Sequence, residues 1–102
     1  MNEFRKELQK DIGLRIKDVR ENQSQEEFAR DTSTIKQTIS KYEKGKIMPG
    51  GEFLYMLHRS RFVNINWLLT GIGNKYMESE LREIERKFKN LKKSKKKSSE
   101  HA

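Results

Sequence analysis

Apolar residues recur every three or four positions over the first twenty residues, and this spacing places side chains on one face of an α-helix. The stripe comprises Phe4, Leu8, Ile12, Ile16 and Val19. It predicts an amphipathic helix over roughly residues 3–21. Gly13 falls inside this helix and is a local cost that packing can tolerate.

A short second helix is predicted over residues 25–31. Ser24 precedes Glu27 by three residues, and at this spacing each side chain can bond the other's unpaired backbone N–H group. Residues 32–34 are Thr, Ser and Thr, whose hydroxyl groups compete for backbone hydrogen bonds. The second helix is therefore expected to stop there.

A third helix is expected to begin at once, because Thr34 and Gln37 repeat the capping spacing. Gly45 can adopt the left-handed conformation that ends a helix, and Pro49 prevents an early restart. One face of this helix is apolar and carries Ile35, Ile39 and Tyr42. The opposite face is polar and cationic, and it carries Lys36, Gln37, Ser40, Lys41 and Lys44.

Three further helices complete the predicted order. A fourth is expected over residues 51–60 and a fifth over 65–70, with Asn64 as its N-cap and Gly71 at its end. Trp67 is assigned to the core. A sixth helix would carry a two-heptad apolar seam formed by Met77, Leu81, Ile84, Phe88 and Leu91. Dimerisation through this seam and packing onto its own domain are equally consistent with so short a pattern.

The 102 residues carry a formal charge of +8, which indicates an acidic partner, nucleic acid first and an anionic membrane second. Residues 1–74 have 13 Lys and Arg against 10 Asp and Glu, a net +3, whereas residues 75–102 have 10 against 5, a net +5. Much of the basicity therefore belongs to the end of the chain. Its last residues, 94–102, are expected to form a disordered basic tail.

No constellation in the sequence indicates an enzyme. The chain has no cysteine, and its histidines, His58 and His101, are far apart, so we expect no metal site and no cofactor. His58 is expected to pack, partly buried, on the fourth helix. There is no glycine-rich phosphate loop, no nucleophile beside a base, and no apolar run long enough to span a membrane. These absences predict a cytoplasmic protein without a small-molecule ligand.

The second and third helices predict a helix-turn-helix, whose second helix fits the major groove of double-stranded DNA. The polar face suits that place. A Gln amide can bond adenine N6 and N7, and a Lys can donate to guanine or to a phosphate. The alternative for such a charged stripe is a solvated helix face, and the stripe alone does not separate the two.

Three sequence elements resemble the phage repressor and Cro-like helix-turn-helix proteins, often called the XRE family, over roughly residues 12–71. The first is the spacing of Gln25, Ala29 and Ile39, in which Gln opens the second helix, Ala allows close helix approach and Ile fills the core. The second is TISKYEKG, followed by a proline, and the third is INWLLTG. All three occur in the family's order and at similar distances.

The resemblance implies an all-α fold, with a five-helix lambda-repressor-like helix-turn-helix domain over residues 1–74 and a C-terminal helix over 75–93. It places the base-reading positions at Lys36, Gln37, Thr38, Lys41 and Gln25. It places phosphate contacts at Ser24, Lys44 and Lys46. It also matches Arg20 and Glu43 to a structural salt bridge between the first helix and the end of the third.

The turn departs from the family pattern. Ser33 occupies a position where the family usually has glycine, and Thr32 occupies an apolar position, which predicts a wider or strained turn. The loop between Arg20 and Gln25 is shorter than is common. Ile35 replaces a polar residue at the start of the third helix, where it either touches a thymine methyl group or packs.

We therefore expect a bacterial or phage transcriptional regulator that binds double-stranded DNA as a homodimer and acts as a repressor. The alternative is a protein-interaction module, antitoxin-like or an oligomerising adaptor, that acts through the C-terminal helix.

Overall fold

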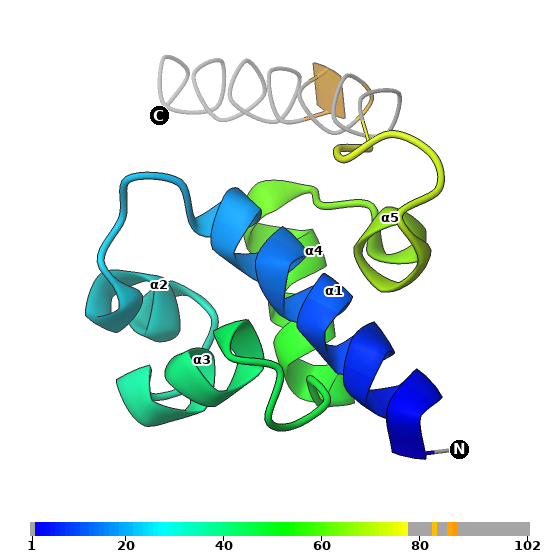
Figure 1. The fold of residues 1–102 in the computed structure, drawn as a ribbon. Helices are drawn as coiled ribbons and strands as arrows, with labels where there is room; N and C mark the ends of the chain where they lie inside the picture. The colour runs from blue at the N-terminus through cyan, green and yellow to red at the C-terminus, as the bar shows by residue number, and fades with distance from the viewer. Residues whose placement is uncertain (1, 78–82, 84–85, 88–102) are drawn as a thin grey trace, which may run out of the picture.

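The computed structural model describes residues 2–77 together with residues 83, 86 and 87. Five helices follow one another, and no strand occurs within residues 2–77 (Figure 1). They are α1 (Asn2–Arg20), α2 (Gln25–Asp31), α3 (Lys36–Glu43), α4 (Gly51–Arg61) and α5 (Ile65–Thr70). The prediction of an all-α, five-helix domain is confirmed.

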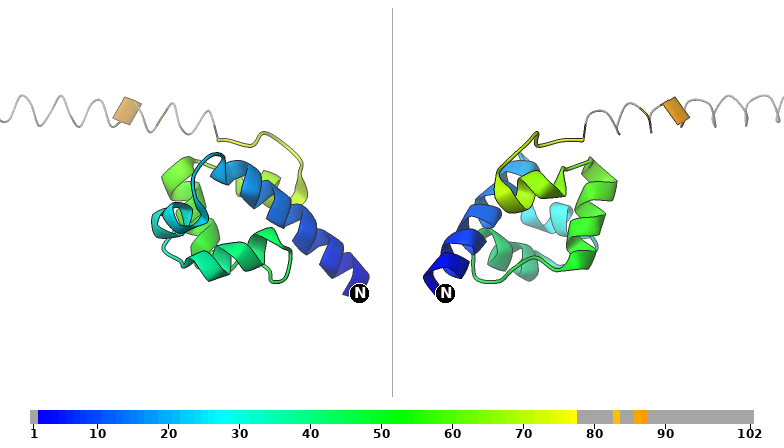
Figure 2. Two further views of the ribbon diagram at one scale, coloured as in Figure 1. Left: turned by 60° about the vertical axis from the view of Figure 1, so that its left-hand side comes forward. Right: turned by 90° about the vertical axis from the view of Figure 1, so that its right-hand side faces the viewer.

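Helix α1 crosses the middle of the domain and contacts α3 on one side and α5 on the other (Figure 1). Helix α2 packs against α3, and the right-hand view of Figure 2 shows α4 on the side of the domain opposite α1. The α2–α3 pair is therefore supported from behind and leaves its outer surface open.

The core forms where the inner faces of the helices meet. Its buried side chains are Ile12, Ile16, Val19, Phe28, Ala29, Ile39, Tyr42, Phe53, Leu57, Val63 and Leu68. Burial of each large apolar side chain stabilises the fold by ~1.5–3 kcal/mol. The ring of Phe53 meets Phe28 edge-on at 6.2 Å and lies tilted against Tyr42 at 4.8 Å. These aromatic contacts join α4 to α2 and to α3.

Most helix ends lie where the capping residues predict them. Ser24 Oγ accepts a hydrogen bond from the backbone N–H of Glu27 at 3.1 Å, and the side chain of Asn64 caps α5. Gly45 and Gly71 have φ values of 71° and 76°, the left-handed conformation that closes α3 and α5. Local backbone chemistry therefore sets these boundaries.

The start of α3 differs from the prediction. The helix begins at Lys36, and its N-cap is Ile35, which makes no side-chain cap hydrogen bond. Thr34 does not cap it, because the Thr34 N–H is still bonded to the carbonyl oxygen of Ala29 at 2.9 Å and so belongs to the end of α2. Ile35 is 61% exposed, so its assignment to the apolar face is also wrong.

Two other apolar residues lie outside the core to which the sequence assigned them. Phe4 is 71% exposed, because the first turn of α1 projects beyond the helices that pack against its middle (Figure 1). Trp67 is only partly buried at the edge of the core. Leu68 is the fully buried side chain of α5.

Residues 75–77, which the sequence places in the C-terminal helix, are extended instead. They run beside the α4–α5 connection, where the Asn64 N–H donates to the Lys75 carbonyl oxygen and the Met77 N–H donates to the Phe62 carbonyl oxygen, both at 2.8 Å. The other seam residues, Leu81, Ile84, Phe88 and Leu91, and the tail 94–102 lie outside the described residues.

The extended segment is tied to the end of α1 by polar contacts. Lys75 Nζ lies 3.1 Å from a carboxylate oxygen of Asp18, and the Tyr76 hydroxyl donates to Glu21 at 3.3 Å. Desolvation lowers the pKa of Lys75, but the hydrogen bond to Asp18 and the neighbouring negative groups outweigh it and leave the pKa raised. The chain therefore returns to its own domain after α5.

Candidate nucleic-acid interface

The turn between α2 and α3 holds two residues that depart from the family pattern. Ser33 has a φ of 57°, a conformation that costs a non-glycine residue roughly 1–2 kcal/mol, so the predicted strain is confirmed. Thr32 is fully buried, and its hydroxyl donates to the Phe28 carbonyl oxygen at 2.8 Å. This bond satisfies the hydroxyl group at a position that would otherwise suit an aliphatic side chain.

The end of α3 is shaped by Gly45. Its N–H donates to the Tyr42 carbonyl oxygen at 3.0 Å, and the N–H of Lys46 donates to the Lys41 carbonyl oxygen at 2.9 Å. This pair of bonds is the Schellman arrangement, which reverses the chain within one turn. Lys46 consequently lies beside the polar face of α3 rather than beyond its end.

An open depression runs along the polar face of α3 and has a volume of about 430 Å³. It is lined by Gln25, Lys36, Gln37, Ser40, Lys41, Lys44 and Lys46. Six of these were predicted to contact DNA, and the fold brings them together from α2, α3 and the following loop. Thr38 and Ser24, also predicted, do not line the depression.

The depression is strongly positive. Four lysines line it, and no carboxylate does so among the residues that the structure describes. Lysine ammonium groups donate to phosphate and to the acceptors of guanine, and the amides of Gln25 and Gln37 supply paired donor and acceptor atoms. The arrangement can bind a polyanion and distinguish bases on the same surface.

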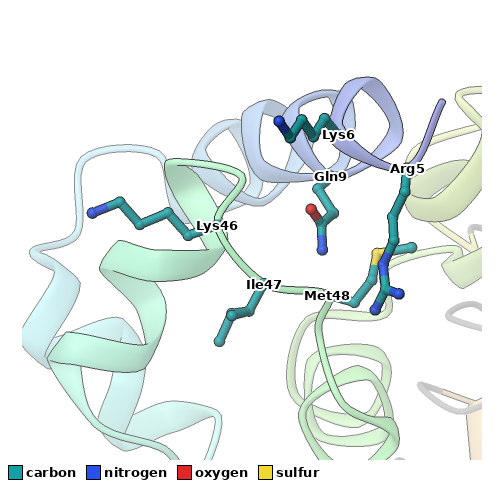
Figure 3. Close-up of a pocket in the computed structure, with 6 residues that line it drawn as sticks. All are labelled: Arg5, Lys6, Gln9, Lys46, Ile47 and Met48. Carbon is teal, nitrogen blue, oxygen red and sulfur yellow. The ribbon is translucent and has the colours of Figure 1, made fainter. Parts of the chain in front are cut away.

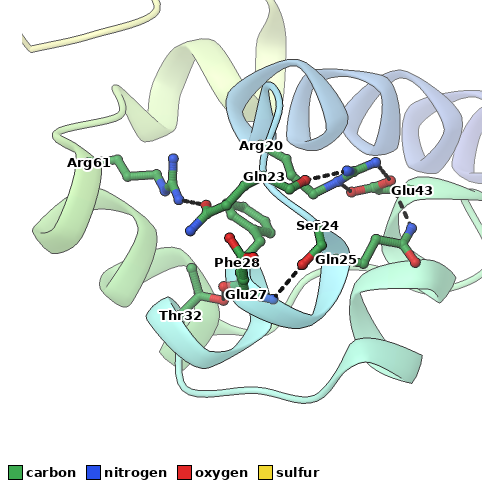
Figure 4. Close-up of polar contacts among 9 residues, drawn as sticks. All are labelled: Arg20, Gln23, Ser24, Gln25, Glu27, Phe28, Thr32, Glu43 and Arg61. Atoms are coloured by element: carbon green, nitrogen blue, oxygen red, sulfur yellow. Dashed lines mark hydrogen bonds and ion pairs between the residues drawn. The ribbon is translucent and has the colours of Figure 1, made fainter.

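A buried ion pair fixes the angle between the helices (Figure 4). Arg20 donates from Nε and Nη2 to the two carboxylate oxygens of Glu43 at 2.7 and 2.9 Å, and from Nη1 to the Gln23 carbonyl oxygen at 2.7 Å. The two charged side chains are 16% and 6% exposed. The hydrogen bond to Glu43 raises the pKa of Arg20 and outweighs desolvation, which lowers it. The predicted salt bridge is thus formed.

Glu43 also holds Gln25. The Gln25 Nε2 group donates to Glu43 Oε1 at 3.0 Å, so one carboxylate connects α1, α2 and α3 (Figure 4). One amide hydrogen and the amide oxygen of Gln25 remain free of this bond and lie at the depression. The ion pair therefore orients a candidate base-reading side chain as well as two helices.

Two residues that position the site were not identified from the sequence. A side chain at Gly13 would place its Cβ 2.3 Å from the Tyr42 carbonyl oxygen. The backbones of α1 and α3 are therefore in direct contact at this residue. Arg15 donates from Nε to the Leu68 carbonyl oxygen at 2.6 Å and thereby ties α1 to the end of α5. A glycine inside a helix was the only signal for the first contact, and none existed for the second.

Arg61, at the end of α4, supports α2 from its other side. Its guanidinium lies 4.9 Å from the ring centroid of Phe28 and hydrogen-bonds to Gln23 (Figure 4). It also hydrogen-bonds to Asp31. His58 is partly buried on α4, as predicted, with Nδ1 3.0 Å from the Val63 carbonyl oxygen.

Neither a metal site nor a membrane-spanning helix occurs in the described part of the chain. No group of three His, Cys, Asp or Glu side chains there could hold a metal ion. In the same residues, no helix has the length and apolar character needed to cross a membrane.

Comparison with known proteins identifies the domain. The helix-turn-helix family matches residues 16–68, which include the second half of the α1 core stripe, the whole α2–turn–α3 unit and α4. The same comparison with curated proteins and with solved structures gave no match. The matched span exceeds half of the 102 residues and contains the cationic depression described above. The chain therefore belongs to the phage repressor and Cro-like (XRE) helix-turn-helix family of DNA-binding regulators.

Proposed function

We propose that the protein is a transcriptional repressor that binds a specific duplex sequence by inserting α3 into the major groove. The observation that carries this proposal is the depression in which two Gln amides lie among four lysines on the exposed face of α3. A merely solvated face would not require α1, α2 and α3 to be connected behind it by one buried carboxylate.

The base-reading residues proposed are Lys36, Gln37, Thr38, Lys41 and Gln25. Gln37 is exposed on the first turn of α3, where its amide can bond adenine bidentately. Lys36 and Lys41 can donate to guanine O6 and N7. Thr38 is partly buried and does not line the depression, so its reach is limited to the edge of the groove.

Ser24, Lys44 and Lys46 are proposed to contact the phosphate backbone. The Ser24 oxygen accepts the α2 cap bond, which leaves its hydroxyl hydrogen to donate outward. Lys44 and Lys46 are exposed at the end of α3. Such contacts position a protein on DNA without reading its sequence.

Ile35 extends the reading surface. Of the two roles that the sequence left open, its 61% exposure beside Lys36 and Gln37 favours contact with a thymine methyl group over packing.

We also propose that the protein acts as a homodimer. The support is the 3-4-3 spacing that Leu81, Ile84, Phe88 and Leu91 keep in the sequence, since Met77, the first residue of the predicted seam, lies in the extended segment. Sedimentation should give two chains per particle for the full chain and one chain per particle for a chain ending at Met77, which keeps the described contacts to α1 and α5. The same number of chains per particle in both proteins would contradict a dimer formed through this seam.

Selection of bound duplexes from a random pool tests the proposed function. The expected product is one enriched sequence with two-fold symmetry and half-site centres about 34 Å apart. Placing that sequence across a promoter should lower transcription when the protein is added. Enrichment of no sequence would contradict specific reading, and increased transcription would contradict repression.

A further inference from the structure

A second basic groove lies between the N-terminal half of α1 and the loop that follows α3 (Figure 3). Its volume is about 510 Å³, and it is lined by Arg5, Lys6, Gln9, Lys46, Ile47 and Met48. The three α1 residues precede residue 16, where the family match begins. The family therefore assigns no role to this part of the chain, which is named here the α1 groove.

The sequence of α1 concentrates positive charge on the side that faces this groove. At about 100° per residue, Arg5, Gln9 and Lys6 fall within an arc of about 100°. The acidic residues of the same turns, Glu3, Glu7 and Asp11, follow the opposite side of the helix and are exposed. The groove is consequently lined by Arg5 and Lys6 of α1 and not by the neighbouring carboxylates.

Gln9 gives the groove a second polar feature. Its side chain points between Arg5 and the loop after α3 (Figure 3), and the residue is only 9% exposed. Its amide has no hydrogen-bond partner within residues 2–77, 83, 86 and 87. The amide atoms still reach solvent, because the buried side-chain atom that lacks a partner in the described residues is Nε of Arg61 and not an atom of Gln9. The Gln9 amide can therefore donate to an acceptor oxygen of an anion that enters the groove.

The α1 groove and the depression on α3 meet at Lys46. Lys46 lines both, and a Cβ placed at Gly45 would lie 2.9 Å from Cα of Lys10, so the loop rests directly on α1. A DNA strand that passes the end of α3 would meet Lys46 first and then the α1 groove. Successive phosphates of one strand are spaced about 3.4 Å along the helix axis, which matches a chain of neighbouring cationic contacts.

We propose that the α1 groove binds a backbone phosphate of the DNA strand that passes Lys46, with Arg5, Lys6 and the Gln9 amide as its donors. This inference rests on the proposed DNA-binding function and extends its contact surface onto a part of α1 outside the family match. The groove adds affinity and fixes the position of the protein along the DNA backbone, and it does not read bases.

The first test measures the salt dependence of binding by the full chain to the selected duplex. Replacing both cations, in Arg5→Gln/Lys6→Gln, should reduce the slope of log K against log salt by about 1, because the one phosphate contact loses its cations, and Arg5→Gln and Lys6→Gln should each reduce it by part of that amount. Arg59→Gln is the matched control, since Arg59 is an exposed cation of α4 that lines neither surface. Slopes for Arg5→Gln and Lys6→Gln that equal the Arg59→Gln slope would overturn the proposal.

The second test replaces single phosphates of the duplex by uncharged methylphosphonates. At one position beside the half-site, wild-type affinity should fall, whereas the affinity of Arg5→Gln should fall no further. If Arg5→Gln loses as much as the wild type at every position, the groove does not bind phosphate, even where base preference is intact. A wild-type protein that binds all sequences equally would instead contradict the proposed function. The effect of each methylphosphonate on its affinity could still be measured, so the phosphate proposal would be tested separately.

Discussion

At the scale of single residues, the side chains proposed to face DNA are held by side chains that lie behind them. Glu43 is the clearest case, because it accepts hydrogen bonds from Arg20 and Gln25 and so joins three helices. The raised pKa of Arg20 means that its charge, and the stability it contributes, are fully present below its ordinary pKa and are lost only as pH rises past the raised value. The Arg20 guanidinium therefore stays charged throughout the neutral range.

Glu43→Ala is expected to lower the free energy of unfolding by ~2–3 kcal/mol, because it leaves the Arg20 guanidinium partly buried without its partner. Urea denaturation followed by circular dichroism measures this change. Asp18→Ala is the control, since Asp18 forms an exposed ion pair with Lys75 and should cost no more than ~1 kcal/mol. Equal losses for the two variants would show that Glu43 is not the structural connection described.

A substitution at Ser33 is predicted to have the opposite effect on the free energy of unfolding. The φ of 57° at Ser33 is unfavourable for serine, so Ser33→Gly should raise the free energy of unfolding by ~0.5–1 kcal/mol after the greater unfolded-state entropy of glycine is counted. Ser60, inside α4, provides the matched comparison, because Ser60→Gly should destabilise by a similar amount. A loss of stability for both variants in thermal denaturation would contradict the strained turn.

At the scale of helices, the position of α3 depends on its contact with α1. The approach at Gly13 is close enough that the backbone carbonyl groups of Tyr42 and Glu43 occupy the space of a Cβ atom. This contact sets how far α3, which carries the proposed reading face, stands out from the domain.

Gly13→Ala should therefore destabilise the protein by ~1–3 kcal/mol, although alanine favours a helix, because α1 and α3 must move apart. Gly51→Ala, at the start of α4, adds the same methyl group where no atom lies within 4 Å and should be neutral or stabilising. Chemical denaturation of both variants measures the difference. A Gly13→Ala protein as stable as Gly51→Ala would exclude the close contact.

The helices also show which features are predictable from sequence. Ser24, Asn64 and Gly45 act on the backbone beside them, so the ends of α2, α5 and α3 could be predicted from local chemistry alone. The exposure of Phe4 and Ile35 depends on where other helices end, which no local pattern records.

The same distinction applies to the candidate site. The lysines of α3 and its one glutamine, Gln37, were predictable because helical spacing places them on one face. The participation of Arg5, Lys6 and Gln9 was not, because it depends on the loop after α3 folding onto α1. The contact between Arg15 and α5 likewise joins residues more than fifty positions apart.

At the scale of the whole molecule, positive charge is concentrated on one part of the surface. Residues 1–74 carry a net charge of only +3, yet the depression on α3 and the α1 groove together collect six cations and, within the described residues, no lining carboxylate. The distribution gives this near-neutral domain one surface suited to a phosphate backbone.

The central claim is that α3 reads bases, and the affinity of Gln37→Ala for two duplexes tests it most directly. Binding to the selected sequence should weaken by ~1–3 kcal/mol, and binding to a scrambled duplex should be unchanged. Lys46→Ala, which removes a phosphate contact, should weaken both duplexes alike. A Gln37→Ala protein that loses the same affinity on both sequences, or on neither, would contradict the account.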